Sequence, residues 1–139
     1  QVLIDPVAPG LFSANGNGEG VAAGVALIVR PDGTQDWRII FDENQEPGSR
    51  AAVPITVGSE SDRVFLLLFG TGMRKSAAAT ATIGGEAVGV AGPAPAPGFA
   101  GVDQVNLGPL PRSLAGAGEV KIALTVGGVP ANVVTVNIR

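Results

Sequence analysis

One apolar run constrains the fold of this chain more than any other feature. Residues 64–69 read Val-Phe-Leu-Leu-Leu-Phe, are apolar at every position and follow Arg63. Six residues are the length of a β-strand, and a strand that is apolar at every position is expected to be covered on both faces in the middle of a β-sandwich. A helix that spans a bilayer needs about 18 apolar residues. We therefore expect this run to form a buried core strand, and we expect no membrane span.

Other short runs rich in β-branched residues recur along the chain, and each is closed by a turn signal. The turn Arg30-Pro31-Asp32-Gly33 predicts a hairpin, because Pro presets one turn angle and Gly accepts a positive φ. The Gly-Gly pairs at 84–85 and 127–128 share a second hairpin pattern. Strands are predicted near 2–4, 10–13, 21–30, 35–41, 53–57, 63–69, 79–83, 86–91, 103–107, 119–126 and 132–138.

The composition favours an all-β protein with many short turns. The chain has 21 Gly and 11 Pro in 139 residues, and 45% of the residues are hydrophobic. The proline-rich stretch 92–98 predicts an extended connection that cannot be a central strand, because each Pro lacks a backbone donor. In the last strand, Val134, Val136 and Ile138 are expected to face the core. We predict one β-sandwich domain over 1–139, with an N-terminal strand and hairpin region at 1–50 and a core at 51–139.

Residue types and charge exclude several classes of function. The chain contains no Cys and no His, which removes thiolate nucleophiles, imidazole bases, disulfides and the usual zinc ligands. We therefore expect no enzyme, no cofactor and no metal site. The net charge of −3 comes from 12 acidic and 9 basic residues without a basic stripe, so nucleic acid is not an expected partner. Because the chain begins at Gln1 rather than Met, we expect a processed protein that is extracellular or on the cell surface.

Three stretches resemble functional motifs and are better explained as structure. Residues 69–76 end in Lys-Ser, but Phe69 and Arg74 stand where a phosphate-binding loop needs Gly. Asn15, Asn17 and Glu19 alternate as in a calcium loop, although no Asp is present and Ala26 stands where the bidentate Glu belongs. The acidic stretch 42–48 is expected to be a solvated turn, because paired catalytic carboxylates need a cleft.

Three further stretches carry a resemblance to a known family. They are Pro9-Gly10-Leu11-Phe12-Ser13, Phe69-Gly70-Thr71-Gly72-Met73 and residues 98–107 followed by Leu110-Pro111. In order and spacing they resemble the Solibacter uncharacterised C-terminal domain family, which is similar to the immunoglobulin-like IPT/TIG domains. The resemblance spans residues 9–138 and implies an immunoglobulin-like β-sandwich with an additional N-terminal β-hairpin. It also implies a module of exported proteins, and it supplies no activity and no catalytic residues.

Three polar or aromatic residues are candidates for a ligand face. Gln104 and Asn106 alternate with apolar residues and so share one face of a strand. We expect these carboxamides to bond backbone in the 92–98 connection, with a ligand site as the alternative. Trp37 is the one Trp of the chain, and we expect it to pack at the core or an edge, with stacking on a sugar as the alternative.

The predicted function is a non-enzymatic extracellular structural or adhesive module that self-associates. Strand pairing between subunits, which could extend to a homopolymeric filament, is expected to involve residues at the two ends of the chain. Those residues are Val2, Leu3, Ile4, Val134, Val136 and Ile138. The alternative is a carbohydrate-binding accessory domain that uses Trp37, Gln104 and Asn106, with a polysaccharide as partner.

Overall fold

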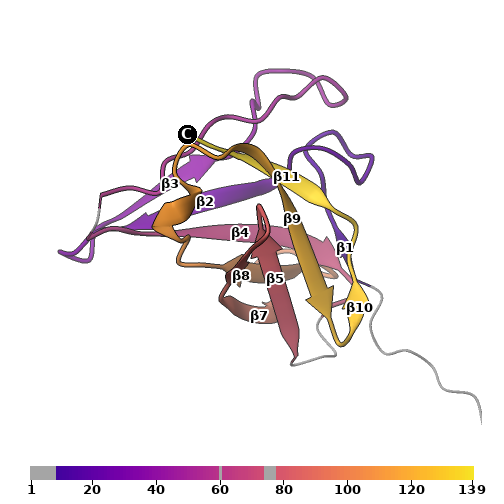
Figure 1. Ribbon diagram of the computed structural model, residues 1–139. Helices are drawn as coiled ribbons and strands as arrows, with labels where there is room; N and C mark the ends of the chain where they lie inside the picture. Colours follow the sequence, from indigo (N-terminus) through magenta and orange to yellow (C-terminus); the bar gives the residue numbers. More distant parts are fainter. Residues whose placement is uncertain (1–8, 60, 74–77) are drawn as a thin grey trace, which may run out of the picture.

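Two antiparallel sheets contain the strands of this computed structural model, which describes residues 9–59, 61–73 and 78–139. Sheet A contains β1 (Gly10–Leu11), β2 (Gly24–Val29), β3 (Gln35–Ile39), β4 (Arg63–Thr71), β7 (Val90–Pro95) and β8 (Asp103–Leu107). Sheet B contains β5 (Ala79–Ile83), β6 (Glu86–Val88), β9 (Gly118–Val126), β10 (Val129–Pro130) and β11 (Val134–Ile138), and a 3-10 turn, η1 (Arg112–Leu114), precedes β9. In Figure 1, β5 and β9 cross in front of β4, so the sheets are stacked as two layers. The predicted all-β sandwich is confirmed.

The strand order places the apolar run in the middle of sheet A. The order is β3-β2-β4-β8-β7, and β1 pairs with the last residues of β4. In sheet B the order is β10-β9-β5-β6, and β11 also pairs with β9. The hairpin predicted from the Pro-Asp-Gly turn is formed by β2 and β3, and Gly33 has a φ of 86°. Both Gly-Gly pairs also form hairpin turns with positive φ at each glycine.

The core lies between the sheets and is built by strands that alternate in burial. In β2 the residues Gly24, Ala26 and Ile28 are buried, whereas the residues between them are half-buried. This period of two follows from the pleat of a strand. The three predicted core residues of β11 are fully buried, as are Leu66 and Ile122 from facing sheets. The described part of the predicted N-terminal region, residues 9–50, therefore contributes to the same core cluster as the described residues after 50.

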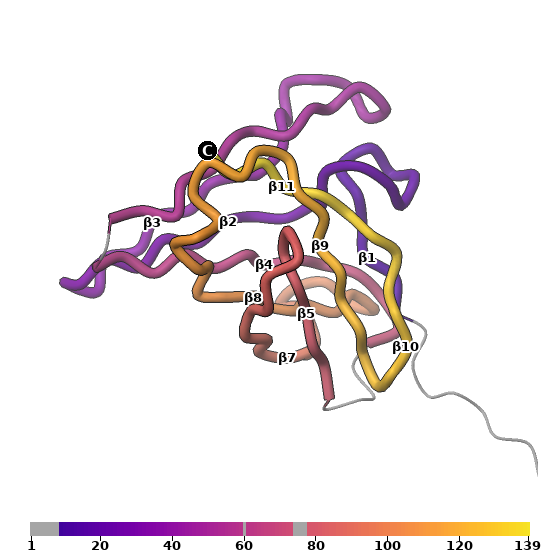
Figure 2. Tube along the Cα trace, in the orientation of Figure 1, coloured from indigo at the N-terminus to yellow at the C-terminus, as the bar shows by residue number. Residues whose placement is uncertain are grey.

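Two strand predictions are wrong in extent. The stretch 53–57 is not a regular strand, because Pro54 lacks a donor and Ile55 alone pairs with Ile138. Figure 2 shows this segment passing the end of β11. The predicted strand 86–91 is two strands in different sheets, β6 and β7, which are separated at Gly89. A Cβ there would lie 2.8 Å from the Gly108 carbonyl oxygen, so glycine permits the close approach at which the chain changes sheets.

Candidate interaction surface

The outer face of sheet A is apolar, although no second layer of the described chain covers it. Register places Trp37 of β3 beside Leu27 of β2, and Leu27 beside Phe65 of β4. The next row runs from Ile39 through Val25 to Leu67. We call this surface the apolar face, and its members are Val25, Leu27, Val29, Trp37, Ile39, Phe65, Leu67 and Phe69. A contiguous apolar surface of this kind on an isolated domain is typical of a site that binds a partner.

Exposure on the apolar face increases toward β3. Leu67, in the centre of the sheet, is 7% exposed, whereas Trp37 is 51% exposed and Ile39 is 38% exposed. Beside Ile39 a recess of about 220 Å³ is lined by Ala23, Gly24, Val25, Ile39, Phe41 and Phe69. The sequence predicted that the run 64–69 would be covered on both faces. That prediction is wrong for the outer side, because Phe65 and Phe69 are half-buried.

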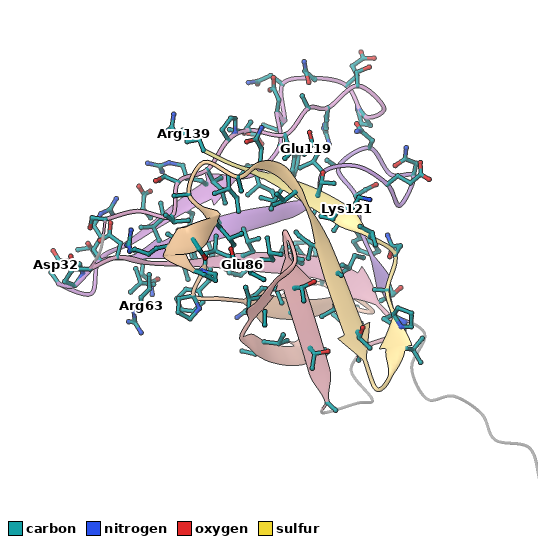
Figure 3. All side chains as sticks on the ribbon, viewed as in Figure 1. Asp32, Arg63, Glu86, Glu119, Lys121 and Arg139 are labelled. Atoms are coloured by element: carbon teal, nitrogen blue, oxygen red, sulfur yellow. The ribbon has the colours of Figure 1, made fainter. Side chains whose placement is uncertain are left out.

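The outer face of sheet B has the opposite character. Its outward positions on β5 and β9 are Thr80, Thr82, Glu119, Lys121, Ala123 and Thr125. Thr135 of β11 donates a hydrogen bond to Glu119 Oε2 at 2.9 Å. Figure 3 shows Glu119 and Lys121 on sheet B, whereas Asp32 lies at the tip of the β2–β3 hairpin and Arg63 lies at the start of β4. A sheet face made of small and polar side chains is an ordinary solvated surface. The apolar face of sheet A is therefore the one that is unusual for an isolated domain.

The β3 strand also has a free edge next to the apolar face. Arg30 N donates to Thr34 O and Ile40 N donates to Gly24 O, so even-numbered residues of β3 bond to β2. The backbone groups of Gln35, Trp37 and Ile39 therefore point away from the sheet. At residues 40–42 the edge is closed, because Val53 N donates to Ile40 O and Asp42 N donates to Ala51 O. The open part of this edge is thus 35–39.

The other edges in the described part of the chain are less suited to pairing. At the opposite side of sheet A, β7 contains Pro93 and Pro95, which have no backbone donor. In sheet B, β6 has three residues and β10 has two. Short or proline-containing edge strands resist the addition of another strand. Among these edges, β3 is the long proline-free one.

Three charged side chains surround the free edge. Arg38 Nη1 lies 2.6 Å from Asp36 Oδ1, and Arg30 Nη2 lies 3.4 Å from Asp36 Oδ2. The hydrogen bond from Arg38 lowers the pKa of Asp36 below its usual 3.8. Asp36 is therefore ionised at neutral pH and pairs with Arg38, two residues along the same strand. Beyond the edge, the Arg50 guanidinium lies 5.3 Å from the centre of the Phe41 ring.

The three residues of the predicted ligand face do lie on one face of sheet A. Trp37 is on β3, whereas Gln104 and Asn106 are on β8, paired with Phe69 and Leu67 of β4. Three strand spacings separate them, which amounts to roughly 14 Å or more. One small ligand therefore cannot touch all three. Trp37 lies on the edge strand β3, and its side chain is too exposed to belong to the core.

The two carboxamides bond to each other rather than to backbone. Gln104 Nε2 donates to Asn106 Oδ1 at 2.8 Å. The expected bonds to the 92–98 stretch are absent from the described residues, because β7 uses its backbone to pair with β8. An extra residue in β7 between Ala91 and Ala94 makes a β-bulge there. A pocket of about 260 Å³ lies at this bulge, lined by Ala91, Gly92, Ala94, Pro95, Pro97, Gln104 and Asn106.

The residues predicted for strand pairing between subunits do not offer a free edge. Val134, Val136 and Ile138 are 0% exposed, and β11 is paired on both sides within the chain. On its second side Thr135 N donates to Gly20 O, and Ile55 N donates to Asn137 O. The prediction for this strand is therefore wrong, because the segments at 20–22 and 55 already occupy its second edge. Val2, Leu3 and Ile4 lie outside the described residues.

The loops that resembled functional motifs are held by internal hydrogen bonds. Asn15 Oδ1 accepts from the backbone of Gly48 and Arg50, and Asn17 Oδ1 accepts from Ser13 and Glu19. These oxygens stabilise turns, and no three acidic side chains gather anywhere in residues 9–59, 61–73 and 78–139. At the Gly-Thr-Gly stretch, Met73 N donates to the buried Asp103 Oδ2 at 2.9 Å. That bond ties the end of β4 to β8.

A pocket of about 580 Å³ lies where the N-terminal segment meets the loop before β11. It is lined by Gly10, Leu11, Phe12, Ser13, Ala14, Gly16, Gly18, Ala23, Arg50, Thr71 and Asn132. One of its polar side chains, Asn132, accepts from Leu11 N and donates to the carbonyls of Leu11 and Gly18. Because these groups satisfy one another, the pocket is a structural junction.

Comparison with known proteins adds no family to this description. No protein-family model, curated protein or solved structure matches the chain. The resemblance to the Solibacter family and to IPT/TIG domains therefore stays a prediction. Nor does the described chain contain a helix with the length and hydropathy that crossing a bilayer requires.

Proposed function

We propose that this protein is a non-enzymatic structural or adhesive module that self-associates through sheet A. The observation that carries the proposal is the difference between the two outer faces. Sheet B presents threonines and charged residues, whereas sheet A presents the apolar face. Burying half-exposed apolar side chains against a partner stabilises a complex by about 25 cal/mol per Å² of apolar area removed from water. A surface of this kind favours a protein partner.

The second candidate, carbohydrate binding, has a narrower basis. The pocket at the β7 bulge contains two carboxamides, which are groups that hydrogen-bond to sugars. However, Leu27, Phe65 and Phe69 lie between that pocket and Trp37, and they offer no hydrogen bond. A sugar chain along the face would lose hydrogen bonds to water without replacing them. The apolar face therefore favours protein over polysaccharide.

An extracellular or cell-surface setting and a filament remain part of the proposal. A filament requires a second contact surface in addition to the apolar face, because one two-fold contact closes a dimer. Residues 2–4, for which strand pairing was predicted, are the segment that we propose for that second contact. Deleting them is then expected to leave dimers and to abolish longer assemblies in negative-stain images.

The test of self-association is the molar mass of the protein over a wide concentration range. We expect light scattering after size-exclusion chromatography to show a mass that rises with concentration. Leu27→Glu, in the centre of the apolar face, should shift the protein toward monomer, whereas the matched change Thr82→Glu on sheet B should not. Circular dichroism verifies that both variants are folded. A monomer at every concentration, or equal effects of the two substitutions, would contradict the proposal.

A pull-down with insoluble polysaccharides separates the two candidates. Under the proposed function, no polysaccharide retains the protein. Retention that is lost in both Trp37→Ala and Gln104→Ala, with unchanged molar mass, would favour the carbohydrate-binding function instead.

A further inference from the structure

We propose that two copies of the chain join β3 to β3 in antiparallel orientation, with a two-fold axis at Trp37. This inference rests on the proposed self-association and specifies its partner, surface and register. In the resulting dimer the two copies of sheet A form one continuous sheet. Three independent features of the edge support this register: backbone direction, charge order and the position of the one Trp.

Backbone direction restricts the registers that can form. Because Gln35, Trp37 and Ile39 point their N–H and C=O groups outward, a partner strand must oppose them with outward residues. An axis at Trp37 pairs Trp37 with its own copy and Gln35 with the copy's Ile39. Every outward residue then exchanges hydrogen bonds with an outward residue. A shift by one residue would place the outward residues opposite residues whose backbone groups already bond to β2, and the hydrogen bonds between the two copies would be lost.

The ends of the edge exclude two of the other two-fold registers, and axes at Asp36 or Arg38 are disfavoured because each would place a charged residue opposite its own copy. An axis at Ile39 would oppose residues 40–42, whose outer side already pairs with 51–53. An axis at Gln35 would oppose Gly33, which is in the turn of the hairpin with a φ of 86°. An axis at Trp37 uses 35–39, which is the whole extent of the free edge.

The charge order of the edge is complementary to its own copy. With the axis at Trp37, Asp36 lies opposite the copy's Arg38, and Arg38 lies opposite the copy's Asp36. These are the non-hydrogen-bonded pairs, in which Cα atoms approach to about 4.5 Å and side chains are closest. The carboxylate and guanidinium already meet at 2.6 Å within one strand, so the four charges can form a ring. Charges on an edge normally prevent pairing with foreign strands, whereas this order accepts its own copy.

The position of Trp37 joins the edge to the apolar face. Its side chain lies on the outer side with Leu27 and is 51% exposed. In the dimer the two indole rings become direct cross-strand neighbours, and aromatic pairs of this kind stabilise antiparallel strands. The apolar faces of the two copies then become continuous across the axis. Pairing through the edge thus removes the most exposed part of the apolar face from water.

Charge reversal with rescue by mixing tests the register. Asp36→Arg alone places two Arg pairs across the axis, and Arg38→Asp alone places two Asp pairs there. Each variant should therefore raise the dimer dissociation constant by about tenfold or more. Mixed in equal amounts, the two variants form only opposite-charge pairs, so they should associate with an affinity close to that of the unmodified protein. Glu43→Arg and Lys121→Asp are charge-matched controls away from the edge and should have no effect.

Sedimentation velocity and tryptophan emission provide independent readouts. Because Trp37 is the one Trp of the chain, its emission reports directly on burial at the axis. We expect a blue shift with concentration in the unmodified protein and in the mixture, but not in either single variant. If Leu27→Glu abolishes association while both reversals associate normally, the β3 register is wrong and the proposed function stands. If the unmodified protein is a monomer at all concentrations, both are wrong.

Discussion

The Asn132 side chain forms hydrogen bonds with the edge of β1 where no neighbouring strand pairs with it. Substituting Asn132 tests whether these bonds stabilise the N-terminal segment. Leu11 is 3% exposed, and its backbone N–H and C=O groups point away from β4. Asn132 Oδ1 accepts from Leu11 N at 2.7 Å, and Nδ2 donates to Leu11 O at 2.9 Å and to Gly18 O at 2.8 Å. The carboxamide therefore pairs with Leu11 as a backbone peptide would.

The magnitude follows from these three hydrogen bonds. Each contributes about 0.5–1.5 kcal/mol net, so Asn132→Ala should lower the free energy of unfolding by about 1.5–4.5 kcal/mol. The upper part of this range applies where the freed groups remain buried, as the backbone of Leu11 does. Asn132→Asp is nearly the same size but cannot donate to the two carbonyl oxygens at neutral pH. It should destabilise at neutral pH and recover partly in acid, because a protonated carboxyl regains one of the two donors.

Urea denaturation at neutral and acidic pH measures both effects. Asn137→Ala is the matched control, because Asn137 lies on the outer side of β11 and its side chain forms no hydrogen bond with the described residues. We expect the control to remain within about 0.5 kcal/mol of the unmodified protein. An unfolding free energy of Asn132→Ala that matches the control would refute the assigned role of Asn132.

Three further predictions concern the sheets. Gly70→Ala should release β1, because a Cβ there would lie 2.0 Å from the Gly10 carbonyl oxygen, and limited chymotrypsin digestion should then cleave near the N-terminus faster than in the unmodified protein. Leu66→Ala should lower the free energy of unfolding by about 2–5 kcal/mol in urea, because Leu66 is 0% exposed; a smaller loss would contradict its core position. Because the pKa of Asp36 is lowered from 3.8 by Arg38, the contribution of its ionised form is present above 3.8 and is lost as pH falls through the folded pKa. Dimers measured by sedimentation should therefore weaken well below pH 3.8, and a constant affinity would argue against the ion pairs.

Turn residues and hydrophobic alternation correctly predicted those strands and hairpins that are determined by neighbouring residues in the sequence. The Pro-Asp-Gly turn and both Gly-Gly pairs form the hairpins that their backbone angles require. Alternation in the last strand identified its three buried residues correctly. By contrast, strand 86–91 was divided between two sheets, because the change of sheet depends on the approach of Gly89 to Gly108. No local pattern contains that contact.

The candidate surface depended still more on tertiary structure. Composition alone removed imidazole and thiol chemistry, and Trp37 could be identified as exceptional because it is the one Trp. The apolar run 64–69, however, is equally consistent with a strand that is covered on one face or on both, because hydropathy does not show which layers pack against a strand. The termini were predicted as pairing edges, yet β11 is paired by β9 on one side and, on the other, by segments more than 80 residues earlier in the chain.

The residues by themselves determined that this chain forms β-strands, where most of its turns lie, and which kinds of chemistry it lacks. These properties depend on backbone angles, side-chain alternation and functional groups, all of which are local. The tertiary structure decided which sheet face lacks a cover, which strand edge is free and how the charges on that edge are ordered relative to the apolar face. Those properties depend on contacts between distant segments, and burial and edge pairing exist only after the sheets have assembled.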